Sequence, residues 1–469
     1  MNDFQSYFVF APIDHGIHHD DFSRVLVQFI DHFSQFFESE KKKNKRGRPS
    51  FNFWSMIKLI LYGLYDGVSH ISKIASYAEY NRIYQYVSDY ITPDEKTIHN
   101  FIKDNSSFLE YLIELTLITA FELEMSDFEH LCVDGTIKKA NCNKYNLFNK
   151  EDISMLIDYY SGSILSDDEI EKLSKPCRNF IKRTDLSDET KLERLLEMKF
   201  QIEDSGQNTI AVNDYESRWM LNKNNETEPS MNIQAAVDSE SKLVCGLDIT
   251  QEGTDHYQLP EIGSIALDYL PTKPEYISAD TGYHTSASFN FLEENQIQGL
   301  IPSRTQTRKA TGRASENKFH KDNMKYDYEK KAFICPNNQY LYLKHEYVDT
   351  RDENGNPLKR RQVYSNYKAC KNCKDKNECC NGKHRSITEY MNPYALDMRE
   401  LLETEEGKEM FKQRSRTVEA PFGTLKRDYH LDSMPISGIS KVKSTLVVLF
   451  SAYNLKLIYR FIMDQCKKI

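Results

Sequence analysis

The chain lacks the features that mark a secreted or membrane protein. Its 469 residues begin with MNDFQ, without the basic region that opens a secretory leader. No long apolar run is present either: the most apolar segment, Ser444 to Leu455, is bounded by Lys443 and Lys456 and is too short to cross a bilayer. We therefore expect this segment to be a core helix of a cytoplasmic protein with two or three structural units.

A surplus of basic charge is also absent. The chain has 61 lysines and arginines against 70 aspartates and glutamates, a formal net charge of −9. This balance does not exclude a nucleic-acid partner, because affinity for phosphates depends on local clusters. One basic cluster, with Arg46 and Arg48, precedes Pro49, and another runs from Arg304 to Lys325. Each is predicted either to contact DNA or to be a solvated face or linker.

Three carboxylates stand in short motifs far apart in the chain: Asp134 in LCVDGT, Asp280 in YISADTGY and Glu419 in RSRTVEAPFGTLK. Each has an ordinary alternative, as a turn residue, a helix cap or a solvated helix position. Together they suit phosphodiester chemistry, in which acidic ligands hold two divalent ions roughly 3.5 to 4 Å apart. Magnesium fits because it prefers oxygen ligands. The motifs indicate an enzyme that cuts and rejoins DNA.

The order of elements around these acids favours one fold. Apolar patterning predicts a strand ending on Asp134, a hairpin with strands near 233–237 and 243–249, and a helix over 256–270. A strand ending on Asp280, a helix to 295, a short strand at 299–302 and a late helix bearing Glu419 follow. This is the order of an RNase H-like α/β domain. That layout places the first two acids on neighbouring strands and the third on the helix beside them.

The rest of the chain divides into further predicted units. Residues 1–125 are expected to form a helical N-terminal domain for DNA binding or dimerisation, with Lys96 near the start of a helix that opens at Thr92-Pro93-Asp94. The α/β core would then comprise 126–150, 229–302 and the C-terminal helices of 399–469. A helical insertion (151–228) and a basic, cysteine-containing insertion (303–398) would interrupt it.

Half of the ten cysteines fall in the second insertion. Cys370 and Cys373 have the two-residue gap that lets both thiolates bind one tetrahedral ion, and Cys335 and Cys379 could complete a four-sulfur zinc site. Cys335 lacks a second cysteine at a matching gap, so free thiols are the alternative. Structural disulfides are not expected in a reducing cytosol.

The motifs and their order resemble those of DDE transposases of bacterial and archaeal insertion sequences, most closely the IS eleven-eighty-two group, which is related to the IS four group. The matching segments span most of the chain: GRPSFNFWSMIKLILYGLYDGVSHISKIASYAEYN, VDGTIKKANCNKY, MNIQAAVDS, ADTGYHTSASFNFLEENQI, and VEAPFGTLKRDY followed by LVVLFSAYNLKLI. The resemblance implies that Asp134, Asp280 and Glu419 are the catalytic triad and bind two Mg²⁺ ions, for which Mn²⁺ can substitute.

The same resemblance implies an activity and its partners. The enzyme would cleave DNA at the ends of an insertion sequence and transfer the freed strand into target DNA. It would bind terminal inverted repeats and target DNA, act as a homodimer and associate with the nucleoid in the cytoplasm. Two alternatives stay open: a catalytically inactive or domesticated DNA-binding relative, and an RNase H-like nuclease without strand transfer.

One motif departs from the family pattern. Related enzymes carry a tyrosine, arginine, glutamate and lysine signature on the late helix, and the spacing of Glu419 and Lys426 agrees with it. Ser415 stands at the arginine position, between Arg414 and Arg416, and Phe411 replaces the tyrosine if Arg414 takes that role. The expected DNA contacts are Lys426, Arg414, Arg416, Asn141, Lys144, Arg46, Arg48 and Lys96.

Asp255, which follows the second hairpin strand, has two open interpretations. Either it orients the metal ligands without binding the metal itself, or it caps the next helix.

Overall fold

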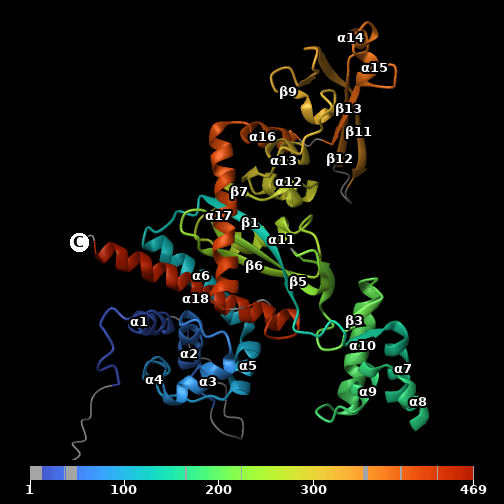
Figure 1. Ribbon diagram of the computed structural model, residues 1–469. Helices are drawn as coiled ribbons and strands as arrows, with labels where there is room; N and C mark the ends of the chain where they lie inside the picture. The colour runs from blue at the N-terminus through green and yellow to red at the C-terminus, as the bar shows by residue number, and fades with distance from the viewer. Residues whose placement is uncertain are drawn as a thin grey trace, which may run out of the picture.

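The structure is a computed structural model that describes residues 13–35, 37, 50–163, 166–222, 224–351, 357–390, 393–429, 431 and 433–467. Its centre is a mixed six-stranded sheet, here called the central sheet (Figure 1). β1 (His130–Lys139) pairs antiparallel with β5 (Thr227–Asp238) and parallel with β7 (Tyr276–Ser278). β8 (Gln298–Leu300) extends the parallel side, and β4 (Arg218–Leu221) and β6 (Val244–Thr250) pair with β5.

β1 corrects one expectation, because it does not end at Asp134. It continues through Gly135 to Lys139, and its pairing with β5 runs from Leu131 opposite Asp238 to Lys139 opposite Ser230. Gly135 is therefore a strand residue and not a turn. A Cβ atom there would lie 2.3 Å from Nε2 of Gln234 and 2.5 Å from Oδ1 of Asp255. Glycine is required because other side chains approach the backbone closely.

Helices cover both faces of the central sheet. α11 (Leu259–Tyr269) packs on β5 and β6, and α17 (Glu405–Arg427) packs on β1, β5 and β7 (Figure 1). α12 (Ser286–Glu294) and α16 (Pro393–Leu401) pack against β8. The resulting mixed α/β fold, with a helical N-terminal region, is compatible with a DDE transposase domain.

α18 (Ile439–Cys466) is longer than the predicted core helix over 444–455. By length and composition it is the one helix of the described residues that could span a membrane, but 61% of the relevant window is buried within the protein. It packs against α2, α6 and β6, and Asn454 donates to the carbonyl of Val244 and accepts from the Val244 amide. These contacts are those of a core helix, as the sequence predicts.

The N-terminal region is helical, as predicted. It comprises α1 (Phe22–Ser34), α2 (Phe53–Tyr65), α3 (Ile71–Tyr80), α4 (Arg82–Val87), α5 (Glu95–Asp104) and α6 (Ser106–Glu122). The side chain of Asp94 accepts the Thr97 amide and caps α5, at the predicted start of that helix. α1 and α4 were not predicted, and Asn105 separates α5 from α6. The buried residues of these helices join those of the central sheet in one continuous core.

A second core lies within α7 (Lys150–Tyr160), α9 (Lys175–Ile181) and α10 (Asp188–Asp204). α8 (Asp167–Lys172) connects α7 to α9. β2 (Leu147–Asn149) pairs with β3 (Thr209–Ala211), so the two ends of this segment are adjacent. Residues 218–221, which we expected in the helical insertion, form β4 of the central sheet instead. Trp219 is on this strand, where its indole N–H donates to Oγ1 of Thr209.

A third region, here called the cysteine unit, spans 321–390. After α13 (Arg304–Ala310) and η2 (Lys321–Asn323), a five-stranded antiparallel sheet contains β9 (Lys325–Asp327), β10 (Ala332–Ile334), β11 (Tyr340–Arg351), β12 (Pro357–Ser365) and β13 (Ser386–Tyr390). α14 (Tyr367–Lys371) and α15 (Lys376–Cys379) connect β12 to β13. Figure 1 shows this unit to one side of the central sheet, beyond α13 and α16.

Candidate active site

Asp134 is on β1, and Asp280 lies two residues past the end of β7, the neighbouring parallel strand. The pairing of β1 with β7 runs from His130 opposite Tyr276 to Cys132 opposite Ser278, and the two aspartates stand two residues further along each chain. Adjacent strands are about 4.8 Å apart and side chains alternate between faces, so this register directs both carboxylates to the same face. Asp280 keeps an extended backbone, and its carboxylate accepts the Gly282 amide at 2.6 Å. It therefore also caps the short 3₁₀ helix that follows.

The side chain of Arg414 on α17 places a positive charge next to Asp134. Nη1 of Arg414 is 3.3 Å from Oδ2 of Asp134, with both side chains largely buried. Thr417, Val418 and Pro421 are buried on the same helix and fix it against the sheet. Among the described residues, the Nε and Nη1 groups of Arg414 find no hydrogen-bond acceptor in suitable geometry. The Nε group therefore has no acceptor in this part of the chain, and the contact of Nη1 with Asp134 is an ion pair without hydrogen-bond geometry.

Glu419 lies further around α17. Its carboxylate is exposed and accepts a hydrogen bond from Oγ of Ser415 at 2.9 Å. The five residues that separate it from Arg414 correspond to about 140° of helix rotation. Within the described residues, the ligand atoms of Asp134, Asp280 and Glu419 are not all within 4.8 Å of one another. The strand register thus gives Asp134 and Asp280 corresponding positions in the chain, and the assignment of all three acids as a catalytic triad stays a prediction.

The outer face of α17 has the predicted arrangement. Ser415, Glu419, Gly423 and Lys426 are all exposed, at helical spacing, and the helix is continuous through Pro421. Open space surrounds Gly423, where an added Cβ atom would meet no described atom within 4 Å. Glu419 and Lys426 therefore lie on one exposed face of the helix, and Gly423 between them has no side chain to obstruct that face.

A polar network beneath Gly135 was missed by sequence reasoning. Oδ1 of Asp255 accepts from Nδ2 of Asn232 at 3.0 Å and from Nε2 of Gln234 at 2.7 Å. The fully buried Tyr283 donates its hydroxyl to Oε1 of Gln234. The predicted capping role of Asp255 is wrong, because α11 begins with Gln258 as its N-cap and has no side-chain cap.

Burial is the main cause of the pKa of Tyr283 being far above its usual value, and the charges of Asp255, Asp134 and Asp280 raise it further. The tyrosine thus stays protonated and acts as a fixed hydrogen-bond donor next to the acidic pair. The available signal in the sequence was the pair Asn232 and Gln234, which are two buried amides that alternate with apolar residues on β5.

The predicted DNA contacts fall in several places. Lys426, Arg416, Lys144 and Lys96 are exposed, whereas Arg414 is paired with Asp134. Nδ2 of Asn141 donates to the Pro435 carbonyl at 3.2 Å, which gives this residue a role in joining the end of β1 to the segment before α18. Arg46 and Arg48, with the rest of the first basic cluster, lie outside the described residues.

The four predicted zinc ligands gather around one small cavity. Cys335, Cys370, Cys373 and Cys379 all line it, and Cys380 does not. Burial raises the pKa of Cys379 to about 11; the neighbouring sulfurs of Cys380, Cys370 and Cys335 also raise it, and Arg385 opposes them. The structure therefore brings together residues that are up to 44 positions apart in the sequence (335 to 379).

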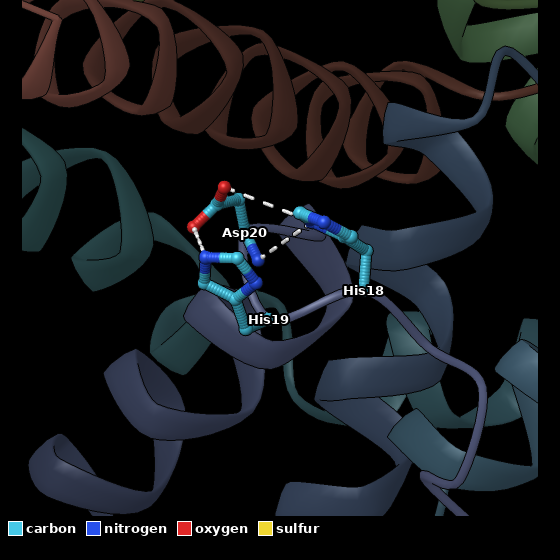
Figure 2. A group of neighbouring side chains, drawn as sticks. All are labelled: His18, His19 and Asp20. Carbon is cyan, nitrogen blue, oxygen red and sulfur yellow. Dashed lines mark hydrogen bonds and ion pairs between the residues drawn. The ribbon is translucent and has the colours of Figure 1, made fainter.

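One other group of possible ligands is on the surface. His18, His19 and Asp20 are the only described residues whose ligand atoms form a set of three within 4.8 Å (Figure 2). Nε2 of His19 is 3.0 Å from Asp20, and the two histidine side chains are 71% and 81% exposed. An ion held by such exposed consecutive residues would keep most of its water, so we assign this group no role.

Two family models match the chain. One, described as Transposase DDE domain, covers residues 334–459 and therefore includes α17 and most of α18. The other, described as Transposase domain (DUF772), covers residues 12–104, which include α1 to α5. A search of curated proteins finds no match. DDE transposases generally use divalent metal ions. Taken together, the two matches support a DDE transposase family for this chain and suggest a nuclease or transferase enzyme.

Proposed function

We propose that this protein is a DNA transposase that cleaves DNA at the ends of an insertion sequence and joins the freed strand to target DNA. The observation that carries the proposal is the register of β1 and β7, which gives Asp134 and Asp280 corresponding positions while Arg414 of the matched DDE segment pairs with Asp134. The central sheet supports an RNase H-like assignment, because its strands follow the predicted order and its late helix carries the proposed third acid.

The donor set fits divalent magnesium. Asp134 on β1 and Asp280 just after β7 offer carboxylate oxygens, and Asp134 already attracts a cationic group in the form of Arg414. These are the hard oxygen ligands that Mg²⁺ prefers, and Mn²⁺ accepts them as well. When bound, a pair of such ions would activate the attacking oxygen and stabilise the leaving oxygen.

Glu419 is proposed as the third ligand, and it needs a change of side-chain position to serve. Among the described residues, its carboxylate accepts a hydrogen bond from the exposed hydroxyl of Ser415, a bond between two solvent-accessible groups. Such a bond contributes roughly 1 kcal/mol, so metal and DNA binding can displace it. Rotation of the glutamate about its side-chain torsions extends it from the outer stripe of α17 toward the two aspartates.

Cationic residues on α17 are proposed to bind the DNA backbone. The Nε and Nη1 groups of Arg414 are buried next to Asp134, where a phosphate bound at the acidic pair would accept from them. Lys426 and Arg416 are exposed and reach phosphates from the outer surface of the helix. Arg414 would thus exchange the Asp134 carboxylate for a phosphate when DNA and metal ions enter.

The test is cleavage of a supercoiled plasmid that carries the inverted repeats flanking the gene, with Mg²⁺. Asp280→Asn is expected to lower cleavage by at least about 1,000-fold, since it removes a proposed metal ligand, while binding to the repeats is retained in a gel-shift assay. Asp268→Asn, which changes an exposed aspartate on α11, is the matched control and is expected to cleave normally. Metal-dependent cleavage by Asp280→Asn at the wild-type rate would contradict the proposal. Cleavage without joining to a second DNA would instead identify a nuclease.

A further inference from the structure

We propose that Cys335, Cys370, Cys373 and Cys379 bind a single structural Zn²⁺ ion that stabilises the cysteine unit. This site is separate from the acidic pair and does not depend on the proposed transposase activity. It would clamp the turn after β10 to the connection between β12 and β13, two segments that are remote in the sequence.

The backbone presents the sulfurs from tight turns. Cys335 directly follows β10, where its amide donates to the Gln339 carbonyl and its carbonyl accepts from the Asn338 amide. Cys370 and Cys373 occupy one turn, since the Cys373 amide donates to the Cys370 carbonyl. Cys379 is the last residue of α15. Three short turns of this kind, each offering one or two cysteines, match the way structural zinc sites are built.

The side chains converge on an enclosed space. The four cysteines line one cavity of about 30 Å³, together with Asn337 and Arg385. A volume of this size is on the scale of one water molecule or ion. Nδ2 of Asn337 donates to Sγ of Cys373 at 3.3 Å, a contact that supports a sulfur carrying negative charge. Arg385 adds a positive charge at the wall, as a cluster of thiolates requires.

Cys380 provides an internal comparison. It is the neighbour of Cys379 in the chain, but its Sγ is directed toward the Gly382 carbonyl, 3.8 Å away, and it does not line the cavity. The convergence is therefore specific to four of the five cysteines in this unit.

The unit also needs an additional source of stability. Among the described residues, its core cluster contains six buried apolar residues: Met324, Tyr326, Phe333, Leu341, Tyr364 and Ile387. Small units with few buried side chains usually require a metal or disulfides to hold their fold. Binding energy at a structural zinc site is folding energy, because the ligands are assembled only in the folded state.

The sulfurs must move closer together when the ion binds. In the described residues, no three of these ligand atoms lie within 4.8 Å of one another. Tetrahedral zinc with bonds of about 2.3 Å places its sulfur ligands roughly 3.8 Å apart. A change of cysteine rotamer moves a sulfur without a change in the backbone turns, and we propose that such changes close the site around the ion.

The first experiment measures zinc in the full-length protein, purified without chelators from cells grown with added zinc. Elemental analysis is expected to give one zinc per chain for the wild type and for Cys380→Ser, the matched control. Cys370→Ser and Cys373→Ser are expected to retain less than about one tenth of that zinc, because losing one thiolate ligand opens the tetrahedral site. A wild type without zinc, or one that carries iron instead, would overturn the proposal.

A second measurement keeps the proposal testable if the cysteine variants fail to fold. The wild-type protein is stripped of metal under reducing conditions and titrated with Co²⁺. Binding of one ion by four thiolates is expected to produce thiolate-to-cobalt charge-transfer bands and the visible bands of a tetrahedral site, which Zn²⁺ then removes. Proteolysis within 321–390 is expected to slow when the ion is restored. Absence of these bands, with all cavity thiols reactive toward a thiol reagent, would contradict a metal site.

Discussion

The central sheet and the cysteine unit differ in how they position their polar side chains. The central sheet shares one continuous core with the N-terminal helices and with α17 and α18, and strand register on that core gives Asp134 and Asp280 corresponding positions. The core cluster of the cysteine unit contains six buried apolar residues among those described, and four cysteines line a cavity beside it. A large core can fix two acidic residues at corresponding positions of neighbouring segments, whereas we propose that the small one depends on zinc–sulfur bonds for its stability.

Truncation of one core residue in each region tests this difference most strongly. Leu247 in the central sheet and Phe333 in the cysteine unit are each 1% exposed. Either change to alanine is expected to cost about 2–5 kcal/mol, since it removes a buried side chain and leaves a cavity. Leu247→Ala should lower the main unfolding transition, while Phe333→Ala should destabilise only the cysteine unit. Calorimetry measures the unfolding transitions, and limited proteolysis within 321–390 measures the local stability of the cysteine unit. Equal shifts of one common transition in the two variants would show that the regions are not independent.

Asp214 lies where the segment after α10 meets the start of α18, and its titration makes the stability of the protein depend on pH. Asp214 is 2% exposed, and burial raises its pKa to about 6, with Glu216 as a further raising charge. The folded protein therefore binds this proton more tightly than the unfolded chain does. The contribution of Asp214 to the free energy of unfolding is largest below about pH 4 and is lost as the pH rises through about 6. This contribution amounts to about 3 kcal/mol at most.

Asp214→Asn is expected to remove this dependence, because asparagine stays neutral. Its oxygen can still accept the Gly438 amide, as Oδ1 of Asp214 does at 3.2 Å. Denaturant unfolding is measured at pH 5 and at pH 8. The free energy of unfolding should fall less between these two pH values in the variant than in the wild type. Identical pH profiles for the two proteins would mean that Asp214 titrates normally.

The smallest expected effect compares two similar hydrogen bonds. Tyr283 donates to Gln234 beneath the acidic pair, and Tyr364 donates to Gln362 at 2.7 Å in the cysteine unit. Changing either tyrosine to phenylalanine should cost about 1–2 kcal/mol, because a glutamine oxygen loses its donor. Only Tyr283→Phe should also lower DNA cleavage, since Gln234 helps to hold Asp255 against Gly135. Equal cleavage by the two variants would limit this network to a structural role.

The elements with a clear apolar pattern could be predicted from the sequence, and so could the acidic residues at or just after their ends. Short apolar runs identified the strands before Asp134 and Asp280, and the short gap between Cys370 and Cys373 indicated that both could bind one ion. The continuation of β1 past Gly135 was missed, because Asp-Gly is a turn signal unless the pairing of β5 is known. The partners of Asp255 depend on contacts between remote strands, which local patterns do not contain.

Glu419 marks the limit of helix-pattern reasoning. Its spacing to Lys426 was visible in the sequence, but the direction of its side chain depends on which face of α17 contacts the sheet. That face is set by Thr417, Val418 and Pro421 and by the pairing of Arg414 with Asp134. The exposed position of Glu419 could be learned only from the packed structure.

The most direct test of the account is the binding of Mn²⁺, followed by electron paramagnetic resonance, to the protein in complex with a DNA end. The wild type is expected to bind two ions per active site, and Asp134→Asn, Asp280→Asn and Glu419→Gln are each expected to lose at least one of them. Glu409→Gln, a change of an exposed glutamate on the same helix, should bind both. Full binding of both ions by Asp134→Asn and Asp280→Asn would contradict the claim that these two aspartates form the metal site.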